Sequence, residues 1–429
     1  MPNDTGTPVP SLARRLGTGD AIVIGLGSMI GAGVFATFGP AARAAGSGLL
    51  IGLAIAAVVA YCNAVASAQL AAVYPVSGGT YAYGRETLGA WWGFTAGWAF
   101  VIGKTASCAA MALTFASYAV TGPAWVHRLT AVGAVGALAV LNYRGVTKTA
   151  VATRVLVALT LVALGVFVFA VLSSGTVEFS RLGGMSSASP DGLYGVLQAA
   201  GLLFFAFAGY ARIATMGEEV KDPTTTIPRA IPAALFIVVG VYAVVGMSAL
   251  VVAGADSLAG SGSPLVAAAD AAGRGGVDPV LRAGAAVASL GALLALMAGI
   301  GRTSLAMSRN SDLPQWLGAV HPRFRVPHHA EVALAVVVAI LVVTTDLRGV
   351  LGFSSFGVLI YYAIANASAL TQPAEQRRWP RGLNVLGLAG CLTLAAALPV
   401  GSAVAGLIMF AVGLLGRLIV LRERGRSTQ

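Results

Sequence analysis

The sequence predicts an all-α polytopic membrane protein with about twelve transmembrane helices. Of its 429 residues, 57% are hydrophobic and only 10% are charged, whereas a soluble domain of this size carries roughly 25% charged residues. The charges separate long apolar runs, and each bilayer crossing needs about 20 apolar residues. These observations exclude a disordered chain, a secreted disulfide scaffold and an ordinary soluble enzyme. We interpret the net charge of +11 as the Lys/Arg bias of cytoplasmic loops, so no nucleic-acid partner is expected.

The predicted spans are the apolar runs between charged or Pro/Gly-rich breaks. In chain order they cover residues 20–39, 46–73, 92–121, 125–142, 153–173, 192–217, 229–254, 279–309, 330–346, 349–371, 383–397 and 400–421. No stretch between them is long enough to fold as a separate domain of typical size. The function is therefore expected within or across the bilayer.

Lysine and arginine are distributed unevenly between the two sides of the membrane. With the N-terminus inside, 19 of the 27 basic residues fall in inside loops and tails, six fall outside, and Lys104 and Arg212 remain within the membrane. Because cytoplasmic loops are rich in Lys and Arg, this distribution predicts that both termini are cytoplasmic. We expect a multi-pass protein of the cytoplasmic membrane.

Two spans carry residues that weaken a helix near its midpoint. The first contains Gly25, Gly27, Gly31 and Gly33, and each glycine inside a helix costs about 1 kcal/mol. The sixth contains Phe-Phe-Ala-Phe-Ala-Gly-Tyr over residues 204–210. Close packing of helices through small residues is one interpretation, and a discontinuous helix with exposed main-chain groups is the other. Position favours the second, because spans one and six correspond to each other in two five-helix halves.

At these residues the chain resembles the amino acid–polyamine–organocation (APC) superfamily of permeases. Residues 27–35, Gly-Ser-Met-Ile-Gly-Ala-Gly-Val-Phe, look like that family's G-x-x-I-G-x-G-I-F motif. Further matches lie at residues 74–83, 204–231 and 302–309, in the family's order. The resemblance implies a five-plus-five inverted repeat of leucine-transporter type with discontinuous helices 1 and 6. It also implies a secondary active transporter (permease) that moves amino acids or related small amines by alternating access.

The resemblance divides the chain into four parts. Residues 1–19 are expected to be a cytoplasmic tail, and residues 20–371 a ten-helix core with repeats at about 20–173 and 192–371. Residues 372–421 would add two helices, and residues 422–429 a second cytoplasmic tail.

The resemblance also places a substrate site at the two breaks. The amides of Ala32 and Gly33, at the start of an outer half-helix, would bind a substrate carboxylate with help from the helix dipole. The carbonyls of Met29 and of Phe205 or Ala208, left free by unwinding, would accept the ammonium group. The expected substrate-binding residues are Met29, Ile30, Gly31, Ala32, Gly33, Lys104, Phe205, Phe207, Ala208, Gly209 and Tyr210. Of these, Phe207 and Tyr210 resemble aromatic residues that line or gate the pocket.

Lys104 lies well inside span three, where a basic side chain costs about 2.5–3.5 kcal/mol, so it should face protein or water. Snorkelling or pairing with a buried carboxylate is one interpretation. The other is a cation in the pocket that meets the substrate carboxylate or replaces a coupling ion. The pocket departs from members that exchange cationic substrates, because Ala211 stands where they often carry an acidic residue and aliphatic residues near Leu296 replace an aromatic one. These departures argue against an arginine, agmatine or polyamine specialist.

Several polar residues are candidates for ion coupling or gating. Thr160 stands in span five where some proton-coupled relatives have a lysine in place of sodium, and Ser289 is the nearest hydroxyl on span eight for a sodium site. This favours a proton, or exchange, over sodium. Arg212 in span six is unexplained, and Glu218 and Glu219 at its cytoplasmic end are expected either to gate protons or to pair with Arg85, Arg302 or Lys221. The coupling or gating candidates are thus Lys104, Thr160, Arg212, Glu218, Glu219 and Ser289.

Other functional classes fit the sequence less well. A primary pump needs a phosphate-binding loop or nucleotide domain, and an intramembrane enzyme needs a nucleophile–base pair or a metal cluster inside the bundle. The sequence shows neither pattern, so we expect no enzymatic activity, no cofactor and no bound metal. Two alternatives stay open, which are a sensor of amino acids with the same pocket and an intramembrane enzyme built on the same helical bundle.

Overall fold

The computed structural model describes residues 16–75, 78–144, 150–182, 192–217 and 219–427, and every named element within them is a helix. Ten helical stretches are long and apolar enough to cross a membrane, and two shorter apolar helices occupy the ninth and eleventh predicted positions. The predicted fold class is confirmed. The bounds of the helices are α1 Thr18–Met29, α2 Ala32–Ala36, α3 Phe38–Ala45, α4 Leu49–Val73, α5 Gly79–Leu88, α6 Ala90–Ala119, α7 Ala124–Tyr143, α8 Ala150–Leu172, α9 Gly192–Phe207, α10 Ala211–Ala214, α11 Pro223–Gly260, α12 Pro264–Ala271, α13 Asp278–Arg309, α14 His328–Thr344, α15 Leu347–Leu370, α16 Arg381–Ala397 and α17 Val400–Ser427.

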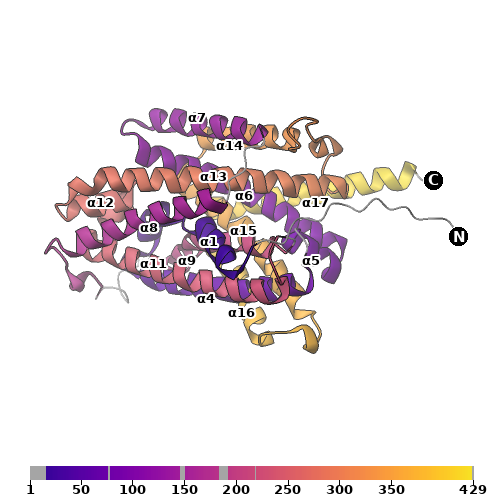
Figure 1. Cartoon of the computed structure of the whole chain (residues 1–429), viewed down its shortest axis with the longest axis horizontal. Helices are drawn as coiled ribbons and strands as arrows, with labels where there is room; N and C mark the ends of the chain where they lie inside the picture. The colour runs from indigo at the N-terminus through magenta and orange to yellow at the C-terminus, as the bar shows by residue number, and fades with distance from the viewer. Residues whose placement is uncertain (1–15, 76–77, 145–149, 183–191, 218, 428–429) are drawn as a thin grey trace.

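The long helices run along the longest axis of the molecule (Figure 1). The short helix α5 and the C-terminal end of α17 lie at the right-hand end of this view, and α12 lies at the left-hand end. We call these the α5 end and the α12 end. Because both termini are predicted to be cytoplasmic, the α5 end is the one predicted to face the cytoplasm.

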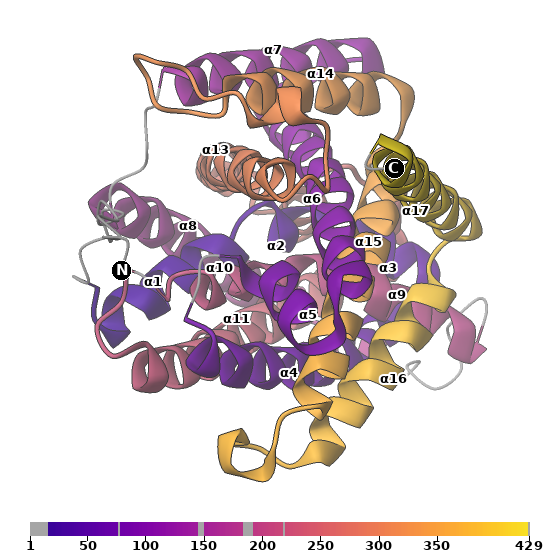
Figure 2. The same cartoon turned by 90° about the vertical axis from the view of Figure 1, so that its right-hand side faces the viewer.

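The helices differ in how much of their surface is covered by protein. In the most apolar window of α6, 78% of the residues are buried, and for α15 the share is 83%, whereas for α7 and α17 it is 17%. Seen from the α5 end, α7 and α14 form a pair on one flank, outside α13 and α6 (Figure 2). The centre of the molecule is thus built around α6 and α15, and α7 and α17 present most of their apolar surface outwards, as expected next to lipid.

Two predicted boundaries differ from the structure. The first span ends at Ala36, and a turn at Thr37 leads into α3, so the helical stretch of span two begins at Phe38. Span seven was predicted from residue 229, but α11 begins at Pro223. Pro223 occupies the first turn, where proline is well tolerated because that turn needs no backbone donor, and Pro228 lies inside the helix.

Candidate functional site

The first span is discontinuous, as predicted. Helix α1 ends at Met29 and α2 begins at Ala32, with Gly31 between them at φ −120° and ψ −138°. The Gly31 amide donates to the Met29 carbonyl at 2.8 Å instead of continuing the helix. A Cβ at Gly31 would lie 2.9 Å from the Cβ of Ala292 on α13. Glycine is therefore required here by close packing against span eight.

The sixth span is broken in a different way. Helix α9 ends at Phe207, Ala208–Tyr210 forms a single 3-10 turn, and the short α10 follows. A Cβ at Gly209 would overlap the carbonyl of Ser28, and one at Gly33 would lie 2.7 Å from the Cα of Ala206. The two breaks therefore lie directly against each other. This brings the predicted site residues of spans one and six together.

The main-chain carbonyls at the breaks are occupied. The hydroxyl of Tyr242 on α11 lies 2.6 Å from the Met29 carbonyl oxygen and 3.1 Å from that of Ala206. The Ala208 carbonyl accepts from Lys104 Nζ at 3.3 Å and from the Tyr362 hydroxyl at 3.2 Å. The prediction that the carbonyls of Met29 and Ala208 are free is therefore wrong for this conformation. Buried carbonyls are costly without donors, and tyrosines of spans seven and ten supply them.

Lys104 reaches the second break from α6. It is 8% exposed, and no carboxylate pairs with it among the described residues. The alternative of an ion pair is therefore not supported within this part of the chain. The site thus combines one buried amine with a main-chain carbonyl at the centre of the bundle.

Aromatic residues enclose the breaks. Phe207 and Tyr210 are fully buried, and Phe205 is 8% exposed. The ring of Phe207 lies 5.2 Å from that of Tyr242, and the ring of Tyr210 lies 4.9 Å from that of Tyr362. The same two tyrosines therefore contact both the aromatic side chains and the carbonyls of the broken helices.

Thr160 lies beside the first break. With Gly27, Ile30 and Ala288, among others, it lines a cavity of about 20 Å³ between α1, α8 and α13, which is room for about one water molecule. Its hydroxyl donates to the Leu156 carbonyl at 2.8 Å. Ser289 is fully buried and its hydroxyl has no partner among the described residues, but it does not line this cavity. The two coupling candidates are therefore not brought to one site.

The partner predicted for Glu219 is corrected. Glu219 pairs with Arg212 at 3.7 Å, not with Arg85, Arg302 or Lys221, and Glu218 lies outside the described residues. The Arg212 side chain is 40% exposed, so a partly accessible ion pair at the end of span six explains it. Of the two basic residues first assigned to the membrane interior, only Lys104 is deeply buried.

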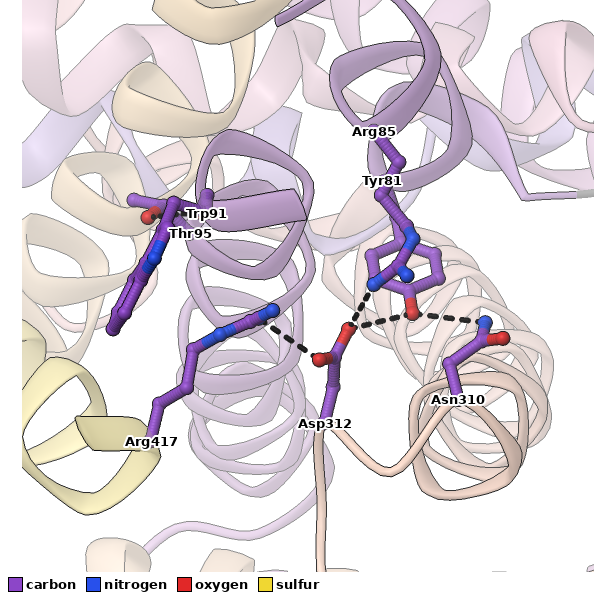
Figure 3. A network of polar contacts seen from close by, with 7 residues as sticks. All are labelled: Tyr81, Arg85, Trp91, Thr95, Asn310, Asp312 and Arg417. Atoms are coloured by element: carbon purple, nitrogen blue, oxygen red, sulfur yellow. Dashed lines mark hydrogen bonds and ion pairs between the residues drawn. The ribbon is translucent and has the colours of Figure 1, made fainter. Parts of the chain in front are cut away.

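A second charged cluster, missed from sequence, lies at the α5 end (Figure 3). The carboxylate of Asp312 accepts from the Tyr81 hydroxyl and from Arg85, each at 2.8 Å, and pairs with Arg417 at 2.9 Å. Asn310 donates to the Tyr81 hydroxyl at 2.9 Å. Arg417 was counted from sequence only as a cytoplasmic charge, and its proximity to residue 312 could not be read from the chain. The network joins α5, the loop after α13 and α17.

Comparisons with known proteins agree with the motifs. Residues 16–417 match the profile of the family described as amino acid permease. An uncharacterized transporter of Mycobacterium tuberculosis is 56% identical over 97% of this chain and 94% of its own length. Cationic amino acid transporter 7, chloroplastic, of Arabidopsis thaliana is 30% identical over 83% of this chain and 65% of its own length. A branched-chain amino acid permease of Bacillus subtilis is 26% identical over 88% of this chain and 85% of its own length. The last two names specify substrates of different charge.

Proposed function

Because this chain belongs to the amino acid permease family, as the APC motifs predicted, we propose that it is a secondary active transporter. It moves amino acids or related small amines across the cytoplasmic membrane by alternating access and is not an enzyme. The observation that carries this proposal is the contact between the two broken helices, with Lys104 bound to the Ala208 carbonyl. Midplane breaks of this kind supply main-chain donors and acceptors to a substrate.

The substrate exchanges partners with the protein when it binds. Lys104 leaves the Ala208 carbonyl and meets the substrate carboxylate, together with the amides of Ala32 and Gly33. The substrate ammonium takes the place of Lys104 at the carbonyl. The substrate carboxylate meets the opposite charge of Lys104 and the substrate ammonium donates to the carbonyl, so neither the amine of Lys104 nor the carbonyl is left without a partner.

The same geometry favours an amino acid with an uncharged side chain. Lys104 already brings one positive charge, and Ala211 offers no carboxylate to a second cationic group. A substrate with a charged guanidinium or amine in its side chain would add a like charge near Lys104. We therefore propose neutral, aliphatic amino acids as substrates.

Competition in proteoliposomes tests this assignment. Unlabelled valine, leucine and alanine are expected to inhibit uptake of labelled leucine, while arginine, lysine and agmatine at the same concentration do not. Stronger inhibition by arginine than by leucine contradicts the substrate class. If no amino acid or amine is accumulated or exchanged, the transporter proposal itself is wrong.

We propose a proton as the coupling ion. The cavity beside Thr160 offers two side-chain hydroxyls, of Thr153 and Thr160, and no carboxylate among its lining residues, whereas Na⁺ is a hard cation bound through several oxygen ligands. Uptake is expected to rise with an inward pH gradient and to be unchanged when choline replaces sodium. Uptake that requires sodium contradicts this part of the proposal.

Main-chain hydrogen bonds near Arg212 connect the two broken spans. The Leu16 amide donates to the Glu219 carbonyl at 3.2 Å, and the Lys221 amide donates to the Leu16 carbonyl at 2.8 Å. These bonds join the start of span one to the segment that follows span six, and the Arg212–Glu219 ion pair holds that segment to the end of span six. We propose that they separate when the transporter opens to the cytoplasm, with both termini on that side.

A further inference from the structure

Three helices outside the broken pair share a buried polar interface. On α4, α15 and α16 the side chains of Asn63, Asn366 and Cys391 are all fully buried. Asn366 Nδ2 donates to Asn63 Oδ1 at 2.6 Å, and Cys391 Sγ donates to the same oxygen at 3.3 Å. Gly387 of α16 leaves the space that Asn366 fills. We call these three residues the upper amide layer.

A second set of amides lies nearer the α5 end. Gln69 follows Asn63 by six residues, Gln372 follows Asn366 by six, and Asn384 precedes Cys391 by seven on the oppositely directed α16. At 1.5 Å per residue, Gln69 on α4 and Asn384 on α16 lie about 9–10.5 Å along the helices from the upper layer. Gln372 lies two residues beyond the end of α15 at Leu370. The exposures of Gln69, Gln372 and Asn384 are 0%, 2% and 0%, respectively. We call them the lower amide layer.

The lower layer is polar without internal partners. Both amide atoms of Gln69, of Gln372 and of Asn384 are buried and have no hydrogen-bond partner among the described residues. The hydroxyls of Ser67 and Ser368, which lie between the layers along α4 and α15, are unpartnered in the same way. A buried polar group without a hydrogen-bond partner destabilises the folded protein. Eight such atoms lie on α4, on α16, and on α15 with the loop that follows it, and these three helices pack against one another.

Water is the partner that fits. A buried water needs two to four polar neighbours, and the two layers with their intervening serines provide donors and acceptors at both ends and in between. The offset of about 9 Å between the layers along α4 corresponds to roughly three water molecules at hydrogen-bond spacing. A metal ion is a poor alternative, since no group of three His, Cys, Asp or Glu able to hold one occurs among the described residues.

The upper layer leads to the candidate substrate site. Asn366 also donates to the Tyr362 carbonyl at 2.9 Å, and the Tyr362 hydroxyl shares the Ala208 carbonyl with Lys104. The titratable groups around Lys104 are Cys108 on its own helix and Tyr210 and Tyr362 beside the shared carbonyl. Glu331 of α14 lies against Gly301 of α13, and its carboxyl group interacts electrostatically with the Cys108 thiol.

We propose that ordered water molecules fill the space between the two amide layers and carry protons between Lys104 and the α5 end. This route is separate from the substrate path between the broken helices. The role of this route in proton transfer rests on the proton coupling proposed above. The presence of water between the layers does not depend on proton coupling. The two parts are therefore tested separately.

The presence of water between the layers is tested with silver ion, a small thiol-reactive cation that reaches a buried thiol through water-filled space. A variant with Cys62 and Cys108 replaced by alanine keeps Cys391 as its only thiol. The matched control places a single cysteine at Leu394, which is on the same helix, 1% exposed and on the α12 side of the upper layer. In nanodiscs, Cys391 is expected to react with Ag⁺ at least about tenfold faster than the control cysteine. Equal rates for the two thiols overturn the proposal.

The lower layer supplies the blocking variants. Asn384→Leu, which replaces the amide by an apolar side chain, is expected to slow the reaction of Cys391 about tenfold. Asn384→Ser, which keeps a polar group, is expected to retain most of the reactivity, and Leu386→Ala on the lipid-facing side of α16 to leave it unchanged. A rate that does not respond to Asn384→Leu overturns the water path.

Proton transfer is tested in proteoliposomes with the native cysteines present. Asn384→Leu is expected to reduce uptake driven by a pH gradient about tenfold and to leave amino acid exchange at equal pH within about twofold. A parallel loss of both activities, or of neither, overturns the proton role. If the wild-type protein moves no protons with any substrate, proton coupling itself is wrong, and the silver reaction alone then decides whether the layers are hydrated.

Discussion

Two buried cationic side chains, Lys104 at the centre and Arg417 at the α5 end, are treated in opposite ways by the fold. The Arg417 side chain is 8% exposed and pairs with Asp312, which also binds Arg85 (Figure 3). Lys104 is 8% exposed, and its amine donates a hydrogen bond to the Ala208 carbonyl without forming an ion pair among the described residues. Paired charges connect the helices that carry them. An unpaired buried charge destabilises the fold, so its presence indicates a role in function. The difference separates a structural cluster from a candidate binding site.

The largest expected effect comes from removing the carboxylate of the paired cluster. Asp312→Ala leaves Arg85 and Arg417 without their shared partner and is expected to lower the free energy of unfolding by about 3–5 kcal/mol. Unfolding in bicelles measures this, with Asp346→Ala as a control that removes only an exposed helix cap worth about 1 kcal/mol. Equal losses for the two variants contradict the structural role of the cluster.

Lys104→Gln is expected to show the opposite pattern. Losing the charge removes a contact to the substrate carboxylate worth about 2–5 kcal/mol, so uptake falls about a hundredfold and its pH dependence disappears. The free energy of unfolding stays the same or rises, because an unpaired buried amine is removed. Uptake across a pH series and unfolding are measured on the same preparations, with Lys221→Gln at an exposed position as the control. Uptake that remains pH-dependent in Lys104→Gln contradicts the proposed role of Lys104.

Tyr362→Phe sharpens the comparison at the centre. It removes one of the two donors to the Ala208 carbonyl and leaves Lys104 as the other. We expect a loss of about 1 kcal/mol, or about fivefold in the KM for uptake. Tyr242→Phe, which removes the donor to the Met29 carbonyl, serves as the companion for the first break. A larger effect of Tyr362→Phe than of Lys104→Gln would show that the tyrosine, not the lysine, is the main donor.

The smallest expected effect concerns Tyr81 in the paired cluster. Burial and the hydrogen bond to Asp312 raise the pKa of Tyr81 from 10.0 to about 12. A group whose folded pKa is raised contributes its stability below the unfolded pKa and loses it as pH rises through the folded one. The wild-type protein should therefore keep a constant melting temperature from this source between about pH 7 and 9, and lose stability from about pH 10 to 12.

In Tyr81→Phe this alkaline loss is expected to be weaker, and stability at pH 7 to be lower by about 0.5–1 kcal/mol. Thermal melts of both proteins over the alkaline range measure the difference. Parallel curves would assign the alkaline transition to other groups.

Much of the fold could be predicted because bilayer physics acts on local sequence. Each span must be apolar over about 20 residues, and the four glycines of span one mark a weak point in any environment. The placement of the breaks in spans one and six follows from such local signals. The extent of α11 was missed because prolines at a helix start resemble loop residues in a hydropathy pattern.

The site could be predicted only in part, since its residues come from helices far apart in the chain. The glycines at 31 and 209 were identified, but the tyrosines that bind the carbonyls were not, because nothing in the sequence around Tyr242 or Tyr362 shows that they face the breaks. For the same reason Glu219 was given the wrong partners. Its true partner, Arg212, is seven residues away. On a continuous helix these residues would be about two turns apart, so the contact depends on the turn of the chain after α10.

The sequence by itself determined that this protein is a polytopic helical membrane protein with weakened helices one and six, because hydrophobicity and helix propensity are properties of neighbouring residues. That it is a permease followed from the resemblance of its motifs to a known family. Only the tertiary structure decided which buried charges are neutralised. Asp312 is placed between two arginines from α5 and α17, and Lys104 against a carbonyl of span six. Electrostatic energy depends on distances between atoms, and those distances are set by the packing of segments that lie between 104 and 227 positions apart in the chain.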